Sequence, residues 1–143
     1  MTSPEAMALS CKEIPTVLAS AGLVDGDALD SDEERRDGDN RPAFWAMRAE
    51  RPSQTSRETF VVWKYSTDEP IDEGDDDSDR KVRCYIDIWS LESFDSPKLI
   101  KLAKRIAKKA KENGWQLEPT DSPYYDNSSQ RTLLSYSAEK VYQ

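Results

Sequence analysis

The stretch that decides the fold is KVRCYIDIWS at residues 81–90, followed by SPKLIKLAKRIAKKAKENGW at residues 96–115. In the first part every second residue from Val82 onward is apolar, and the residues between are charged or aromatic. This alternation predicts a strand with one face on a hydrophobic core. In the second part apolar residues recur at three- and four-residue steps from Leu99 onward, which predicts an amphipathic helix. Together they predict a helix packed on a sheet.

The predicted helix has clear end signals. Ser96 is a candidate N-cap, Pro97 suits the first turn, and Asn113-Gly114 suits the left-handed end of a helix. Residues 97–112 carry seven bases and one acid. Four lysines on the polar side form a charged helix face that stays in water, contacts an anion or a nucleic acid, or meets an acidic loop of a neighbouring subunit. These lysines are Lys101, Lys104, Lys108 and Lys111.

The remaining elements are read from shorter patterns. We expect strands at residues 58–65, 115–118 and 130–136, and a turn-rich loop with two tyrosines at residues 121–127. An N-terminal helix is expected to end at Gly22 and to kink or restart at Pro15, with a capping box from Ser10 to Glu13. The prediction is one α+β domain over residues 1–143. It has an antiparallel or mixed sheet of about four strands, two helices on one face and long acidic loops.

Two acidic segments separate these elements. Residues 25–39 carry a net charge of −6 and residues 66–80 a net charge of −7, and neither has apolar residues at a regular period. Both are expected to be solvated loops. Neither has the ligand order of a calcium loop. The second is a candidate arm that faces another protein or a lumen, through Asp72, Glu73, Asp75, Asp76, Asp77 and Asp79.

The composition excludes several kinds of catalytic and metal-binding site. There is no histidine, which excludes imidazole catalysis and histidine-ligated metal sites. The two cysteines, Cys11 and Cys84, are too few for a zinc site or a disulfide scaffold, and both are expected to be buried thiols in a reducing compartment. The longest apolar run has five residues, whereas a membrane-spanning helix needs about 20. We therefore expect no catalytic residues, cofactor, metal or membrane contact.

The polar side of residues 81–90 is the candidate interface. It carries Arg83, Tyr85, Asp87 and Trp89, two large aromatic side chains among charges. Such a face is either a partly exposed sheet surface or a subunit interface, where aromatic residues and arginine are enriched. The hypothesis taken forward is that these four residues pack against another subunit.

The order of these motifs resembles one family. The segment TFVVWKYSTDEP, an acidic insertion, KVRCYIDIWS, the helix with its Gly-Trp end, and SPYYD before a closing strand are similar to the tail terminator (tail-completion) proteins of long-tailed bacteriophages. The resemblance spans about residues 42–136. The positions that carry it are Thr59 to Tyr65, Tyr85 to Ser90, Leu99 to Trp115 and Tyr124 to Asp126.

The resemblance implies a virion structural protein rather than an enzyme. It implies a homo-oligomeric ring, hexameric as in the family, that caps the tail tube, ends tail polymerisation and joins the tail to the head. The implied partners are further copies of the chain, the tail tube protein and a neck or connector protein. DNA would pass through the lumen without specific binding, because acidic walls repel phosphate. The implied location is the tail–neck region of the virion, after synthesis in the host cytoplasm.

Two other functions fit the same sequence. Another neck component, such as a head–tail connector or stopper, shares the virion context. A small acidic inhibitor that mimics DNA or occupies a basic partner would account for the two acidic segments. The basic helix disfavours this second alternative, since a mimic spreads negative charge over a continuous surface.

Overall fold

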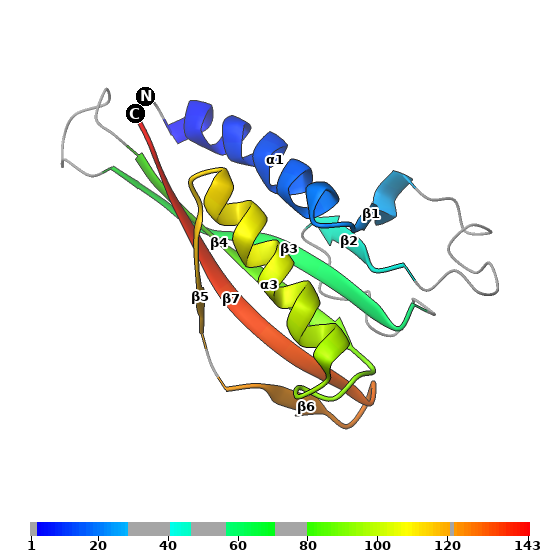
Figure 1. Ribbon diagram of the computed structural model, residues 1–143. Coiled ribbons are helices and arrows are strands. Elements are labelled where there is room, and N and C mark those ends of the chain that lie inside the picture. Colours follow the sequence, from blue (N-terminus) through cyan, green and yellow to red (C-terminus); the bar gives the residue numbers. More distant parts are fainter. Residues whose placement is uncertain (1–2, 29–40, 47–56, 71–79, 121) are drawn as a thin grey trace.

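The computed structural model describes residues 3–28, 41–46, 57–70, 80–120 and 122–143. Within these ranges the chain forms two α-helices and the strands of one mixed sheet (Figure 1). The elements are α1 (Ser3–Ser20), β1 (Val24–Asp25), the 3-10 turn η1 (Gly26–Ala28), β2 (Ala43–Ala46), β3 (Thr59–Pro70), β4 (Arg80–Ser90), α3 (Pro97–Glu112), β5 (Gln116–Pro119), β6 (Tyr124–Asp126) and β7 (Arg131–Tyr142).

The sheet has seven strands in the order β1-β2-β3-β4-β7-β5, and β6 also pairs with β7. The β1–β2 and β2–β3 pairs are parallel, and the other pairs are antiparallel. The predicted α+β class is confirmed, but the expectation of about four strands is wrong. The strands missed, β1, β2 and β6, have only two, four and three residues, too few to show an alternating pattern.

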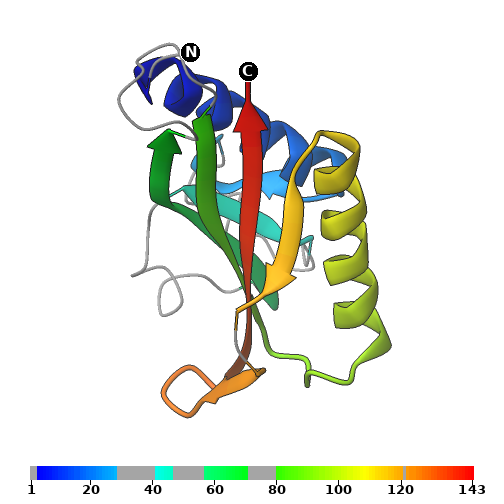
Figure 2. The ribbon, with the colours of Figure 1, turned by 90° about the vertical axis from the view of Figure 1, so that its left-hand side faces the viewer.

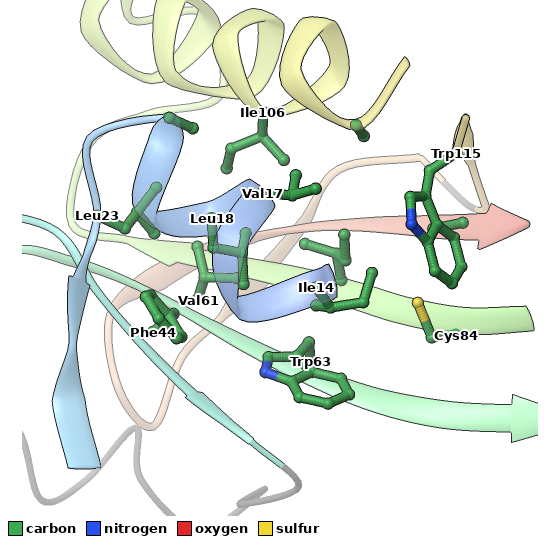
Figure 3. Close-up of a cluster of buried hydrophobic side chains, with 14 of the residues drawn as sticks. Ile14, Val17, Leu18, Leu23, Phe44, Val61, Trp63, Cys84, Ile106 and Trp115 are labelled. Carbon is green, nitrogen blue, oxygen red and sulfur yellow. The ribbon is translucent and has the colours of Figure 1, made fainter. Parts of the chain in front are cut away.

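Both helices cover the same face of the sheet, as predicted (Figures 1 and 2). Ile14 of α1 and Ile106 of α3 are fully buried between the helices and the strands. On β4 the apolar set of the predicted alternation faces this core. Figure 3 shows the cluster, whose labelled members include Val17, Leu18, Phe44, Val61, Trp63, Cys84 and Trp115.

The helix α3 begins and ends where the sequence predicts. Ser96 precedes it in an extended conformation, although its side chain makes no capping hydrogen bond. At the other end the Trp115 N–H donates to the Ala110 carbonyl at 2.9 Å, and the Gly114 N–H donates to the Lys111 carbonyl at 3.0 Å. This Schellman arrangement requires a left-handed residue, and Gly114 supplies it with φ +83°.

The helix α1 is continuous, so of the two expectations for Pro15, a kink or a restart, the restart is wrong. Pro15 lies inside the helix, and the hydroxyl of Ser10 bonds back to the Met7 carbonyl at 2.9 Å instead of capping a new helix. Apolar residues on both sides of Pro15, including Ile14 and Leu18, pack into one core. Their burial stabilises the helix despite the backbone hydrogen bond that proline cannot make.

The hairpin of β3 and β4 is longer than expected. Pairing continues to Pro70 and starts again at Arg80, with a register shift between Tyr65 and Thr67. The expected loop at residues 66–80 therefore contains strand at both ends. The extra length of the two strands depends on backbone hydrogen bonds between them, and the side-chain pattern does not reveal these bonds. The first acidic segment is also structured at its start, where β1 and η1 reach Ala28.

The C-terminal part of the sheet also differs from the prediction. The expected loop at residues 121–127 contains β6, and β7 continues to Tyr142 instead of ending near Tyr136. Both β5 and β6 pair with β7, at different positions along it. One long strand therefore holds two short ones that could not form alone.

The two cysteines lie in different environments, which corrects the expectation that both are buried. Cys84 is buried in the core, whereas Cys11 is exposed on α1. Burial raises the pKa of the Cys84 thiol to about 12, so it stays protonated near neutral pH. Cys11 takes its place on the outer side of α1 because the apolar residues of that helix occupy the other side.

This difference predicts selective modification. In the native protein iodoacetamide at pH 8 is expected to alkylate Cys11 and to leave Cys84 unmodified. The reagent reacts only with a thiolate that is accessible to it. Peptide mass spectrometry measures the two sites separately. Unfolding in urea is the control and should expose both thiols. Equal labelling of the two residues in the native protein would contradict the buried position of Cys84.

Candidate oligomer interface

The face of the sheet turned away from α1 and α3, here called the open face, carries the predicted interface residues. Arg83, Tyr85, Asp87 and Trp89 are half-buried and alternate with fully buried core residues along β4. They stand opposite Glu139, Ser137, Ser135 and Leu133 of β7 in the antiparallel register.

The charged members of this row are held by neighbouring strands. The Arg83 guanidinium contacts Glu139 Oε1 through Nε at 2.7 Å and through a terminal nitrogen at 2.6 Å. Asp87 accepts a hydrogen bond from the Ser135 hydroxyl at 2.8 Å and lies 3.9 Å from Lys64 Nζ. These contacts hold the Arg83 and Asp87 side chains against the neighbouring strands.

Trp89 extends the row into an aromatic stack. Its ring lies nearly parallel to that of Phe60, with an interplanar angle of 11° and centroids 6.4 Å apart. Trp89 is opposite Leu133 in the sheet, and Leu133 is in turn opposite Tyr124 of β6. The open face therefore continues from β4 across β7 to β6.

A second apolar cluster lies beside Trp89 on the same face of the sheet, where the side chains of β2 and β3 are buried. Its fully or nearly buried members are Ala43 and Trp45 of β2 and Phe60 and Val62 of β3. The Arg131 guanidinium lies 5.2 Å from the Phe60 ring centroid and donates to the Arg57 carbonyl at 2.6 Å. Burial lowers the pKa of Arg131, and the cation–π contact and hydrogen bond compensate part of its lost hydration.

Exposed apolar side chains gather at one end of the molecule. Leu91, Phe94, Tyr124 and Tyr125 are 52, 60, 59 and 55 % exposed, and they border a hollow of about 400 Å³. We call these four residues the end patch. Figures 1 and 2 show β6 and the loop between β4 and α3 together at this end, opposite the two termini. Sequence reasoning found the two tyrosines but missed Leu91 and Phe94, although an isolated phenylalanine in a polar loop was a usable signal.

Acidic groups surround the end patch. Hydrogen bonding with Glu58, followed by hydrogen bonding with Ser96, lowers the pKa of Glu92, and Lys98 lies 3.3 Å from Glu58. Hydrogen bonds from the Ser129 side chain lower the pKa of Asp126, whose Oδ2 is 2.7 Å from the Ser129 hydroxyl. The lowered pKa values favour the ionised forms of Glu92 and Asp126.

The other end of α3 is basic and hollowed. Lys101, Lys104, Lys108 and Lys111 are all exposed, as predicted. Beyond the last of them a groove of about 430 Å³ runs between α3 and β5. This α3–β5 groove is lined by Ala107, Lys111, Gly114, Trp115, Gln116 and Leu117.

Other predicted features do not contribute to this surface. The acidic residues Asp72, Glu73, Asp75, Asp76, Asp77 and Asp79 lie outside the described residues. In the fragment Asp25-Gly26-Asp27 the Asp25 carboxylate accepts the Asp27 N–H at 3.0 Å, so it stabilises a turn. Within the described ranges no three potential metal-ligating side chains gather, and no helix is long and apolar enough to cross a membrane.

A scan against protein-family models finds no match to this sequence, and a search of curated proteins returns none either.

Proposed function

We propose that the protein is a structural subunit of a homo-oligomeric ring, of the kind that caps the tail tube of a long-tailed bacteriophage. The ring would end tube polymerisation and offer a surface to a neck or connector protein. In this role the chain acts through shape and contact rather than through a reaction.

The observation that carries the proposal is the half-buried row on β4, within the open face of the sheet. On the described residues α1 and α3 both lie on the opposite face, so the row from Arg83 to Trp89 has no helix over it. Tyrosine, tryptophan and arginine, which supply three of these four side chains, are enriched at protein interfaces. A surface of this kind is expected to be covered by another copy of the chain, because ring closure leaves no subunit face unpaired.

The arrangement of the family-like segments also supports the proposal. The segments that resemble tail terminators form β3, β4, α3 and β6. β3 and β4 are a hairpin, α3 packs over it, and β6 joins the same sheet. Segments that are separate in sequence thus form one continuous unit, as a shared fold requires.

The charge distribution favours a ring over the alternative of an acidic inhibitor. A DNA mimic needs negative charge over a continuous surface, whereas α3 exposes a row of lysines from Lys101 to Lys111. The net charge of −8 is compatible with a lumen through which DNA moves without binding. A different neck component would share the ring and differ in its position in the particle.

Sedimentation velocity tests the proposal. The purified protein is expected to form a closed species several times the 16.3 kDa subunit mass. Trp89→Ala and Tyr85→Ala should shift it toward single subunits, because tryptophan and tyrosine are enriched among the interface residues whose truncation costs about 2 kcal/mol or more. Two variants are needed because Trp89 also stacks on Phe60 within the subunit.

The matched control is Leu9→Ala, which removes an exposed apolar side chain from α1, on the helical side of the sheet. Circular dichroism should show that all variants are folded. A wild-type protein that stays a single subunit at every concentration would contradict the proposal. Immunoelectron microscopy of intact particles then separates a terminator, at the end of the tube, from another neck component.

A further inference from the structure

The two ends of α3 have complementary surfaces. At its N-terminal end the end patch presents exposed apolar side chains, of which Phe94 is the most exposed. At its C-terminal end the α3–β5 groove offers an apolar floor from Ala107, Trp115 and Leu117. The end patch holds four of the seven large apolar side chains that are exposed on the described residues. Such a concentration of apolar surface marks an interaction site.

Carboxylates flank Phe94 in the sequence, and lysines lie beside the groove. Phe94 lies between Glu92 and Asp95 in the sequence, and Asp95 is exposed. Lys111 lines the groove, and the exposed Lys108 lies about one turn before it on α3. Phe94, which is flanked by carboxylates, is therefore complementary to the α3–β5 groove, which lies beside lysines. Complementary charge of this kind fixes the register of a contact and excludes reversed arrangements.

We propose that the end patch of one copy packs into the α3–β5 groove of a second copy, with Phe94 in the groove and Glu92 and Asp95 facing Lys108 and Lys111. This inference rests on the proposed ring and specifies which surfaces form it. The groove volume of about 430 Å³ is at the small end of the usual range for binding pockets, which is enough for one aromatic side chain.

The positions of the two surfaces determine the symmetry of the assembly. Because they lie at opposite ends of one 16-residue helix, about 24 Å long, a copy cannot fill its own groove. A two-fold dimer that filled both grooves would lay two α3 helices antiparallel and bring their lysine faces together, which like-charge repulsion opposes. The contact is therefore head-to-tail, and head-to-tail contacts give rings when the rotation closes.

The contact also joins the open face. Tyr124 of the end patch is linked to Trp89 through Leu133, which is opposite both residues in the sheet. A neighbour seated on Phe94 and Tyr124 would therefore reach Trp89 first and Arg83 last. Trp89 is expected to contribute more to association than the residues farther along β4.

Equilibrium sedimentation of single and paired variants tests the inference. Phe94→Ala should weaken self-association at least about tenfold, the effect of losing a central interface side chain. Asp95→Lys and Lys111→Glu should each weaken it, because each places like charges together. The double variant Asp95→Lys/Lys111→Glu should recover most of the wild-type affinity, since it restores opposite charges in reversed order.

Leu9→Ala is again the control and should associate like the wild type, and circular dichroism should show every variant folded. Rings of normal affinity from Phe94→Ala would overturn this inference and leave the proposed ring intact, assigning the end patch to a different partner. A double charge variant as weak as its two single variants would also overturn it. A wild-type protein that never associates would overturn the proposed function itself.

Discussion

Replacing Trp115 by alanine is expected to lower the free energy of unfolding by about 3–5 kcal/mol, the usual cost of deleting a buried tryptophan side chain. Trp115 is 1 % exposed and follows the last turn of α3. Its ring meets that of Tyr142 edge-on, with centroids 6.2 Å apart. The truncation would leave a cavity between the end of α3 and β7, and both elements would lose contacts.

A hydrogen-bonded carboxylate adds to this cost. The Trp115 indole N–H donates to Glu13 Oε2 at 3.1 Å. The same oxygen accepts from Lys140 Nζ at 2.7 Å and from the Tyr142 hydroxyl at 2.8 Å. Glu13 thus connects α1 to the end of α3 and to β7, and hydrogen bonds to a charged group stabilise by about 1.5–3 kcal/mol each.

Urea denaturation at a fixed protein concentration measures the effect, since association adds to the apparent stability. Trp115→Phe is the matched control: it keeps most of the ring volume, loses the bond to Glu13, and should cost less than half as much as alanine. If Trp115→Ala is too unstable to purify, Trp115→Leu gives an intermediate measurement. A loss below about 1 kcal/mol for alanine would contradict the buried position.

The second large effect is expected from Gly26→Ala, which should destabilise the protein by about 3 kcal/mol through overpacking. A methyl group on Gly26 would lie 2.0 Å from Cε2 of Trp45 and 2.3 Å from its Nε1. Trp45 is itself buried and packs edge-on against Phe60, with ring centroids 5.9 Å apart. The indole therefore cannot move aside without disturbing the second cluster.

The direction of the expected change in stability identifies its cause. Gly26 is not in the left-handed region, so alanine there would ordinarily stabilise by reducing the entropy of the unfolded chain, by about 0.4–1 kcal/mol. Only the contact with Trp45 reverses that expectation. Removing the indole should remove the penalty, so Gly26→Ala should cost much less in a Trp45→Leu background. Equal costs in the two backgrounds would show that the indole is not the obstacle.

Much of the architecture was predictable because it depends on local patterns. The helix α3 has a serine and a proline at its start, an apolar stripe and a terminal glycine within one short segment, and its bounds were predicted correctly. The alternation of β4 predicted which side chains are buried. By contrast, β1 and β2 form a parallel edge of the sheet. Nothing in four residues or fewer distinguishes such a strand from a loop.

The candidate interface also has one part that was predictable from the sequence and one part that was not. The row from Arg83 to Trp89 was identified from sequence, because its members share one face of one strand. The end patch was not, because its residues come from the loop after β4 and from β6, more than 25 residues later. Leu91 and Phe94 meet Tyr124 only because β6 pairs with β7 and β7 pairs with β4.

The sequence by itself therefore determined the class of the fold, the helix α3 with its lysine row, and the two faces of β4. Those features follow from periodicity, which reports which side of a single element is apolar. The tertiary structure alone decided that Glu13 binds Trp115 and that Gly26 contacts Trp45. It also placed the apolar end patch at one end of α3 and the α3–β5 groove at the other. These depend on which distant segments become neighbours, and that is set by strand pairing and by the shared burial of residues far apart in the chain.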